Sequence, residues 1–349
     1  MAAYPGGRVG PDDPRYPTLV RGFNLRWVGS PQHVELCGTP EQVRAAVQSA
    51  VDDDRRITVR GGGHCYEDFV SGNDGGVIID LTAMHDVGRD EHGLYFVEGG
   101  CTLWNVYWDL YRLYGVALPA GSCYSVGAGG HIIGGGYGLL ARLHGLTVDW
   151  LYAVEVVHVD ADGQAQIVTV RRDSEDPDER DLLWGHQGGG GGNFGVVTKF
   201  FFRELPQAPS EAHVVTLAWD WKTLDEDGFA AIVGNYGKFF AANSAVGSPY
   251  AGLFALLHLF QRANGQITVV AQYVGDEPHR LDDFVAAMTA GDTPAAVAPS
   301  GRLGYHGAPA PTIAPRRLPW LYATQWLDGS GPNQRGKYKS AYMLKPFPP

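Results

Sequence analysis

Apolar residues in the first 205 positions recur with two alternating periods, one helical and one extended. After Thr39, valines and alanines return every three or four residues as far as Val51, which predicts an amphipathic helix. Thr39 and Gln42 fit a capping box at its start, with Pro40 in the first turn. Further apolar runs predict strands at 57–60, 77–81 and 94–98 and a helix at 103–110. This alternation indicates an α+β or α/β domain.

This alternation of strands and helices continues to residue 205, beyond which the pattern of apolar positions differs. The next segments predict strands at 153–159, 166–170 and 196–202 and a helix at 180–184. Beyond Pro206 the pattern predicts an aromatic strand at 214–221 and a hairpin at 253–274 that turns at Asn264-Gly265. It then predicts a helix at 281–288 and a long loop at 291–318. We therefore expect two domains, at 1–205 and 206–349.

Composition narrows the classes of function. The chain has 349 residues, 44% of them hydrophobic, and a formal net charge of −11. The acidic balance argues against a nucleic-acid or anionic-membrane partner, and no apolar run of about 18 residues could span a membrane. Residues 1–10 lack an export-signal pattern, so a cytoplasmic location is expected. The cysteines show no ligand spacing, which predicts no metal site and favours small buried hydrophobes at Cys37, Cys65 and Cys101, whereas the surroundings of Cys123 set it apart.

Glycine is in excess, at 48 residues, and it is concentrated in three segments. Gly61–Gly63 follows a predicted strand, where successive backbone N–H groups can bind a pyrophosphate; a set of tight turns is the alternative. Residues 121–138 hold eight glycines, which predicts neither helix nor strand. Residues 188–192 are all glycine, and no segment has the G-x-G-x-x-G spacing of a Rossmann fold. Three such loops indicate one large ligand with several contact points, such as a dinucleotide.

Three stretches carry a resemblance to a known family: ITVRGGGHCYEDF at 57–69, PAGSCYSVGAGGHIIGGGYGLLARLHGLTVD at 119–149 and DLLWGHQGGGGGNFGVVTK at 181–199. They resemble the flavoproteins of the p-cresol methylhydroxylase/vanillyl-alcohol oxidase superfamily, and within it the berberine-bridge-enzyme-like branch. The nearest likeness is to bacterial bicovalent oxidases of glycosylated and polyketide natural products. The resemblance is dense over about 15–205 and thinner as far as KYKSAYMLKPF at 337–347.

The resemblance implies an α+β fold with an FAD-binding domain of the p-cresol methylhydroxylase type and a substrate domain. The first has two subdomains, at about 20–98 and 99–205, and the second is an antiparallel sheet with helices. Family members continue well past the position of Pro349, so the resemblance also implies that the C-terminal remainder of the substrate domain is missing. A half-built sheet would leave an open edge and an uncovered apolar face, which favours a fragment over a natural truncation.

The resemblance also implies an FAD that is attached twice, through His64 to the flavin 8α-methyl group and through Cys123 to C6. Both residue types suit such bonds, because imidazole is nucleophilic near neutral pH and a thiolate is more so. Val126 matches a position where a small side chain admits oxygen in oxidases, and His131 is either structural or beside the flavin. The other cofactor-binding residues implied are Arg60, Gly61, Gly62, Gly63, Cys65, Asp68, Gly127, Gly130, Gly134, Gly135, Gly136, Asn193, Gly195 and Val197.

The implied activity is that of an FAD-dependent oxidase. An alcohol carbon of a sugar or glycosylated secondary metabolite gives a hydride to the flavin, a base takes the hydroxyl proton, and O2 reoxidises the flavin to give H2O2. Tyr137 and Tyr342 match catalytic tyrosines on the substrate side, although Tyr342 equally suits a packed strand. Trp219, Trp221 and Tyr273 suit either stacking on a ring or a sheet core. Two alternatives stay open: dehydrogenation or oxidative cyclisation of a non-sugar scaffold, and a catalytically silent flavin-binding protein.

Overall fold

The computed structural model describes residues 5–299 and 313–341 of the chain. It divides the chain into two compact units. The first unit comprises Met1–Gly138, Leu146–Gln207 and Ser330–Lys339, and the second comprises Leu139–Gly145, Ala208–Gly329 and Ser340–Pro349. Compared with the two predicted domains, a short segment after the glycine-rich stretch joins the second unit, and a segment near the C-terminus returns to the first.

The first unit contains a four-stranded sheet with the strand order β1-β2-β4-β3. Its strands are β1 (Gly7–Val9), β2 (His33–Leu36), β3 (Ile57–Arg60) and β4 (Val77–Asp80). β4 pairs in parallel with β2 and β3, while β1 is antiparallel to β2. Every residue of β4 is buried, because Val77 and Ile79 pack in one hydrophobic cluster and Ile78 in another on the opposite face. The strands predicted at 57–60 and 77–81 are thereby confirmed.

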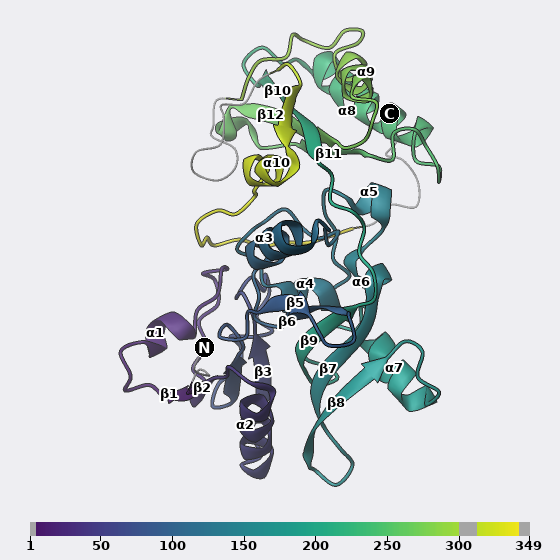
Figure 1. Ribbon diagram of the computed structural model, residues 1–349. Coiled ribbons are helices and arrows are strands. Elements are labelled where there is room, and N and C mark those ends of the chain that lie inside the picture. The colour runs from purple at the N-terminus through teal and green to yellow at the C-terminus, as the bar shows by residue number, and fades with distance from the viewer. Residues whose placement is uncertain (1–4, 300–312, 342–349) are drawn as a thin grey trace. The chain divides into compact units, whose positions relative to one another are not determined.

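Helix α2 (Pro40–Asp52) packs on this sheet, and the short α1 (Tyr16–Leu19) precedes it in the chain (Figure 1). Thr39 Oγ1 accepts a hydrogen bond from the Gln42 backbone N–H at 3.2 Å, which confirms the predicted N-cap. Gln42 Oε1 accepts from the Gly38 N–H at 2.7 Å, one residue before the position that a capping box requires. The helical period correctly predicted the buried face, which is formed by Val43, Ala46, Val47 and Ala50.

The first unit also contains a five-stranded antiparallel sheet with the order β5-β6-β9-β7-β8. Its strands are β5 (Val87–Arg89), β6 (Tyr95–Glu98), β7 (Leu151–Val159), β8 (Ala165–Arg171) and β9 (Val196–Phe202). The predicted β7–β8 hairpin is confirmed, and β9 lies between β6 and β7 in the centre of the sheet. Three helices accompany these strands: α3 (Leu103–Tyr114), α6 (Thr147–Trp150) and α7 (Pro177–Gly185).

A further helix, α4 (Ala128–Ile133), lies inside the glycine-rich segment 121–138, so the prediction that this segment forms no helix was wrong. Glycine in a helix costs about 1 kcal/mol relative to alanine. Here the apolar residues of the helix are buried, and a Cβ on Gly129 would lie 2.5 Å from the Gly99 carbonyl oxygen. Glycine therefore lets the helix pack directly on the backbone that follows β6, and this packing outweighs the low helix propensity.

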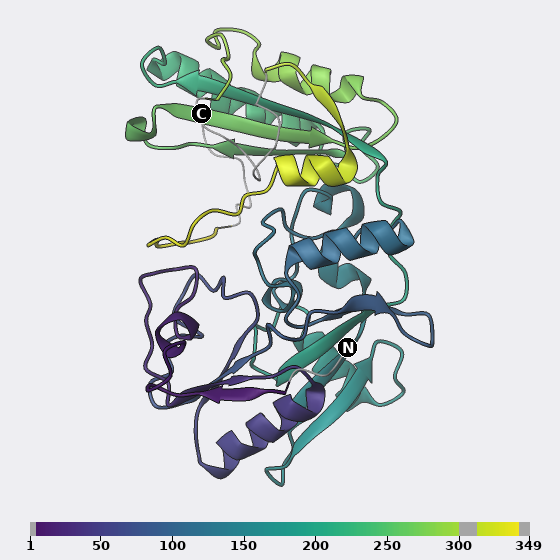
Figure 2. The same ribbon diagram turned by 60° about the vertical axis from the view of Figure 1, so that its left-hand side comes forward.

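The second unit is built on an antiparallel sheet with the order β11-β12-β10-β13. Its strands are β10 (Glu211–Asp220), β11 (Leu253–His258), β12 (Gln266–Tyr273) and β13 (Arg316–Pro319). Its helices are α5 (Ala141–His144), α8 (Glu226–Ala242), α9 (His279–Met288) and α10 (Trp320–Trp326), with a 3₁₀ turn at Arg262–Asn264. Figure 2 shows α8 and α9 together on one side of this sheet.

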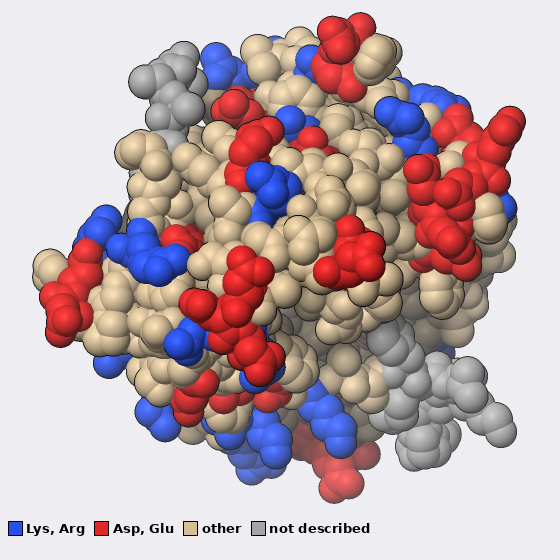
Figure 3. Space-filling model, turned by 90° about the horizontal axis from the view of Figure 1, so that it is seen from below, with Lys and Arg blue, Asp and Glu red and all other residues tan. Residues whose placement is uncertain are grey.

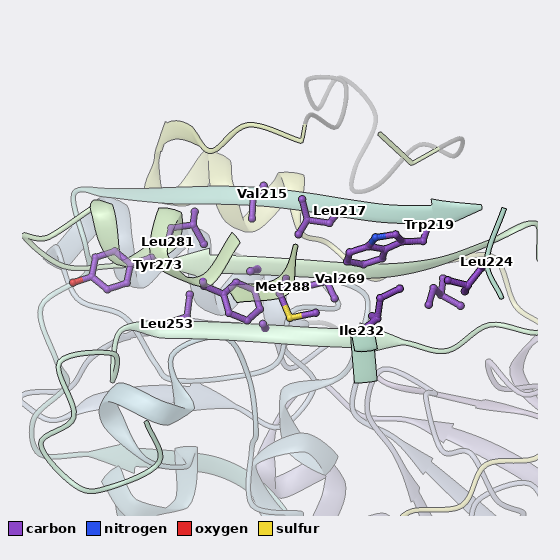
Figure 4. Close-up of a cluster of buried hydrophobic side chains, with 14 residues drawn as sticks. Val215, Leu217, Trp219, Leu224, Ile232, Leu253, Val269, Tyr273, Leu281 and Met288 are labelled. Atoms are coloured by element: carbon purple, nitrogen blue, oxygen red, sulfur yellow. The ribbon is translucent and has the colours of Figure 1, made fainter. Parts of the chain in front are cut away.

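The core of the second unit lies between this sheet and helices α8 and α9 (Figure 4). Trp219 of β10 is 1% exposed and Tyr273 of β12 is 4% exposed. Both belong to this core, and Trp221 packs against its edge. Of the two roles that the sequence left open for these aromatics, the structure gives them that of a sheet core.

Among the described residues of the second unit, helices α5, α8 and α10 and strand β13 were not predicted. Helices α8 and α10 lie in segments without a recognised helical pattern, and β13 occupies the end of the predicted 291–318 loop, of which 300–312 lie outside the described residues. The β11–β12 hairpin is confirmed, and its turn ends at Gly265 with a φ of 84°.

Charged side chains of both signs are interspersed on the face shown in Figure 3, which contains no continuous basic surface. Among the residues that the structure describes, no helix has both the length and the apolar character that a membrane span requires.

Candidate functional site

A cavity of about 890 Å³ lies in the first unit, and all three glycine-rich segments contribute to its wall. Gly61–Gly63 directly follows β3, the lining residues within 121–131 come from the loop before α4 and from α4 itself, and Gly190–Gly192 precede β9. Cavities of roughly 300–1,000 Å³ hold small molecules and cofactors. The segments that the sequence analysis assigned to one ligand therefore line one cavity.

Most of the residues predicted from the sequence are among those that line this cavity. They are Arg60, Gly61, Gly62, Gly63, His64, Cys65, Cys123, Val126, Gly127, Gly130, His131, Tyr137, Asn193, Gly195 and Val197. Asp68 and the segment Gly134–Gly136 are not part of the wall. Tyr342 lies outside the described residues.

Gly134–Gly136 has a structural explanation. Gly135 and Gly136 have φ values of 114° and 77°, and a Cβ on Gly136 would lie 2.0 Å from Thr147 Oγ1. Glycine is needed there for a left-handed turn and for contact with the start of α6. These glycines therefore serve the local turn and are not part of the cavity wall.

The loops that hold His64 and Cys123 touch through their backbones. A Cβ on Gly62 would lie 2.3 Å from the Gly127 nitrogen, and one on Gly127 would lie 2.1 Å from the Gly62 nitrogen. A Cβ on Gly130 or on Gly191 would instead meet nothing within 4 Å. At Gly62 and Gly127 the absence of a side chain lets two loops meet in the cavity wall. At Gly130 and Gly191 it leaves open space beside the cavity, which a larger side chain would fill.

His64 is held by an aromatic ring and by a hydroxyl group. The Phe23 ring stacks on its imidazole with centroids 4.6 Å apart and an interplanar angle of 18°. The His64 Nε2 atom lies 3.0 Å from Ser125 Oγ, which places the two glycine loops in direct side-chain contact. Burial lowers the pKa of His64 below its usual 6.5, so the neutral, nucleophilic ring predominates at neutral pH.

The four cysteines fall into two classes. Cys37 and Cys101 are buried, and desolvation raises the pKa of Cys37 to about 12 and that of Cys101 still higher. These two are the buried hydrophobes that the sequence favoured. Cys65 and Cys123 are half-buried on the cavity wall, and the Cys65 thiol donates to the Glu67 carbonyl oxygen at 3.1 Å.

His131 combines the two roles that the sequence left open. Its Nε2 atom accepts a hydrogen bond from the Gly121 N–H at 2.9 Å, and the residue also lines the cavity. Burial lowers its pKa to about 4, which keeps the ring neutral and able to accept that bond. Its acceptor nitrogen therefore fixes the loop that leads to Cys123.

Arg60, the last residue of β3, stabilises the start of the first glycine loop. Its guanidinium lies 3.4 Å from the buried carboxylate of Asp80 and donates to the Leu19 carbonyl oxygen. A buried charge of this kind is stable only when it is paired. Arg60 thus lines the cavity while its charge is neutralised by Asp80.

The structure adds a segment that sequence reasoning missed, the C-terminal strap (residues 330–339). Tyr338 stacks on Tyr66 with centroids 3.9 Å apart, and Asn24 donates to the Gly336 carbonyl oxygen at 2.9 Å. Ser330 Oγ accepts from the Ser125 N–H at 3.0 Å. Apart from its aromatic residues, no sequence signal pairs these positions, because they come from opposite ends of the chain.

Known proteins were compared with this chain, and the FAD binding domain family matches residues 31–169. The chain is 42% identical over 355 residues to aclacinomycin-N/aclacinomycin-A oxidase of Streptomyces galilaeus, covering 96% of this chain and 62% of that protein. It is 38% identical over 363 residues to hexose oxidase of Chondrus crispus, covering 96% and 65%. A solved glycopeptide hexose oxidase, complexed with teicoplanin, matches with a TM-score of 0.81 and 36% identity, covering 96% and 67%.

Fold, cavity and family match together define an FAD-binding α+β protein. The chain belongs to the p-cresol methylhydroxylase/vanillyl-alcohol oxidase superfamily, in its berberine-bridge-enzyme-like branch. It spans 62% and 65% of the length of the two curated relatives. The open space beside Gly130 and Gly191 and the two half-buried nucleophiles on the wall fit a bound FAD.

Proposed function

We propose that the cavity of the first unit holds FAD through two covalent bonds, from His64 to the 8α-methyl group and from Cys123 to C6. The observation that carries the proposal is that a neutral imidazole and a half-buried cysteine side chain line the same glycine-walled cavity. The deeply buried Cys37 and Cys101 are unsuited to this role, because their raised pKa values disfavour the thiolate.

The proposed reaction is the oxidation of an alcohol. Bound FAD supplies the hydride acceptor. Tyr137 lines the cavity and is 60% exposed, so its side chain can reach a substrate hydroxyl and, as the phenolate, take its proton as the base. Val126 presents a small side chain on the wall, which leaves room for O2. The products are then a carbonyl compound and H2O2.

The proposed substrate is a sugar or a glycosylated natural product. Support comes from the relatives, which are by name a hexose oxidase, a glycopeptide hexose oxidase and an aclacinomycin oxidase. The chain spans less than two thirds of the length of the curated relatives. The activity is therefore proposed for this chain together with any residues that the full protein adds to it.

The cofactor proposal is tested by denaturing the purified protein and measuring its intact mass. We expect the wild type to keep one FAD, the single variants His64→Ala and Cys123→Ala to keep it through the remaining bond, and the double variant to release it. Asp68→Asn is a matched control, since Asp68 lies outside the cavity wall. Release of free FAD from the denatured wild type would contradict the bicovalent attachment.

The reaction is tested by mixing the protein with sugars, glycosides and aglycones without oxygen and following the flavin absorbance. Bleaching by sugars or glycosides, followed by H2O2 release when air is admitted, is the expected result. Bleaching by aglycones alone would favour dehydrogenation or cyclisation of a non-sugar scaffold. Flavin that no substrate bleaches would identify a catalytically silent protein.

A further inference from the structure

The hydrogen bonds around His64 form a short chain of hydroxyl groups. Ser125 Oγ lies 3.0 Å from His64 Nε2 and 3.0 Å from Ser330 Oγ, to which it donates. Ser330 Oγ also accepts from the Ser125 backbone N–H. His64 Nε2, Ser125 and Ser330 therefore form a continuous line that runs from the cavity wall to the C-terminal strap.

The protons on this line can be counted. A serine hydroxyl carries one proton, and Ser330 Oγ is within reach of that of Ser125. With the Ser125 proton on the Ser330 side, Ser125 Oγ can only accept from His64, and Nε2 then carries the ring proton. A neutral imidazole has a single N–H, and the other nitrogen, Nδ1, is left with a free lone pair.

We propose that Ser125, oriented by Ser330, is a positioning residue that selects the His64 tautomer in which Nδ1 is the nucleophile for flavin attachment. The inference rests on the covalent bond of the proposed function and names the residues that prepare it. Phe23 completes the arrangement, because its stacked face holds the ring plane and stabilises the positive charge that develops when Nδ1 forms the bond.

The attachment balances as follows. A bond forms between His64 Nδ1 and the 8α carbon, using the Nδ1 lone pair, and one C–H bond of the methyl group breaks to release a proton. The electron pair of that C–H bond stays on the flavin, which is thereby reduced by two electrons. Nε2 gives its proton to Ser125, and the released protons pass by way of solvent to the reduced flavin. Dioxygen then takes two electrons and two protons as H2O2.

This arrangement makes attachment depend on the C-terminal strap. Ser125 belongs to the loop after α3, whereas Ser330 lies about two hundred residues further along the chain. Removing the Ser330 hydroxyl would free the Ser125 proton to point at Nε2, and the ring proton would then sit on Nδ1. The strap therefore has to be in place before His64 becomes reactive.

The test measures covalent flavin in a Cys123→Ala background, where His64 is the only attachment point. Flavin-free protein is mixed with FAD, and the attached fraction is followed by mass over time. Ser125→Ala and Ser330→Ala should each slow attachment on the order of a hundredfold. Ser125→Thr should restore it, because threonine keeps the hydroxyl. Ser340→Ala, an exposed serine beyond the strap, is the matched control.

Non-covalent binding is measured beside attachment, as the absorbance of FAD on the native protein. Normal binding with slow attachment in both alanine variants supports the proposal. Attachment at the rate of the Cys123→Ala background in Ser330→Ala overturns it, even if Ser125→Ala fails to fold. If the Cys123→Ala protein itself never attaches FAD, the bicovalent attachment fails, and that result is distinguished by the absence of any His64 adduct.

Discussion

Replacing Gly62 with alanine tests whether backbone contact between the two glycine loops holds the cavity together. The backbone of Gly62 has no left-handed φ, so alanine adds no conformational strain. Its Cβ would lie 2.3 Å from Gly127 N, 2.7 Å from Gly127 Cα and 3.0 Å from Ser125 O. These are backbone atoms, which cannot swing away as a side chain can, so the whole loop has to shift.

The cost can be worked from these distances. Ordinary contact begins at 3.4 Å, so the loops must separate by roughly 1 Å. Overpacking of this kind costs about 1–3 kcal/mol. The shift also separates His64 from the Cys123 loop, so covalent FAD should fall together with stability.

The assay combines the free energy of unfolding in urea with the covalent flavin content of the denatured protein. Gly7→Ala is the matched control, because a Cβ there meets nothing within 4 Å and the backbone has no left-handed φ. We expect Gly62→Ala to lose stability and flavin while Gly7→Ala keeps both. Unchanged stability in Gly62→Ala would refute the role assigned to the close approach.

Two further substitutions test how a buried histidine sets the pH dependence of stability and how one glycine of the cavity wall affects FAD content. His186 is 1% exposed, and neither ring nitrogen has a hydrogen-bond partner among the described residues. Burial lowers its pKa to about 4, so the unfolded chain binds a proton at a higher pH than the folded chain does. The folded state therefore loses stability as the pH falls from about 6.5 to 4. His186→Leu should remove that loss, by up to roughly 3 kcal/mol in unfolding measured at pH 4 against pH 7, and an identical pH profile in the variant would contradict it. Gly130→Ala should stabilise α4 of the flavin-free protein by about 0.5–1 kcal/mol, because the added Cβ meets nothing within 4 Å. The same Cβ should narrow the cavity and lower the FAD content of the protein. An FAD content equal to that of the wild type would argue that Gly130 does not face the cofactor.

The elements that the sequence predicted are those whose pattern is local. Helix α2 shows its buried face as a regular repeat and starts at a capping threonine, so its four buried residues follow from the sequence alone. The predicted strands β4, β7 and β9 are apolar runs of the kind that burial requires, whereas β1, β2 and β5 carry no such run and were not predicted. Their order is another matter, because the placement of β9 between β6 and β7 depends on pairing between distant segments.

Helix α8 was missed although its sequence marks its inner face. Only Gly228 and Ile232 are buried, but the residues that pack on the core recur at helical spacing: Phe229, Ile232, Tyr236, Phe239 and Phe240. Glycines within the helix lower its intrinsic propensity. Packing of this stripe on the sheet of the second unit outweighs that low propensity.

For the site, sequence reasoning pointed to the residues proposed to carry the chemistry and not to those proposed to orient them. His64 and Cys123 stand out by their place in glycine-rich loops, but Ser125 and Ser330 are ordinary serines until the fold brings them together. The same glycines explain the difference. A glycine can border open space, as at Gly130, or allow contact between two backbones, as at Gly62, and the residue is the same in both cases. Only the distance from a hypothetical Cβ to its neighbours distinguishes them, and that distance is a property of the fold.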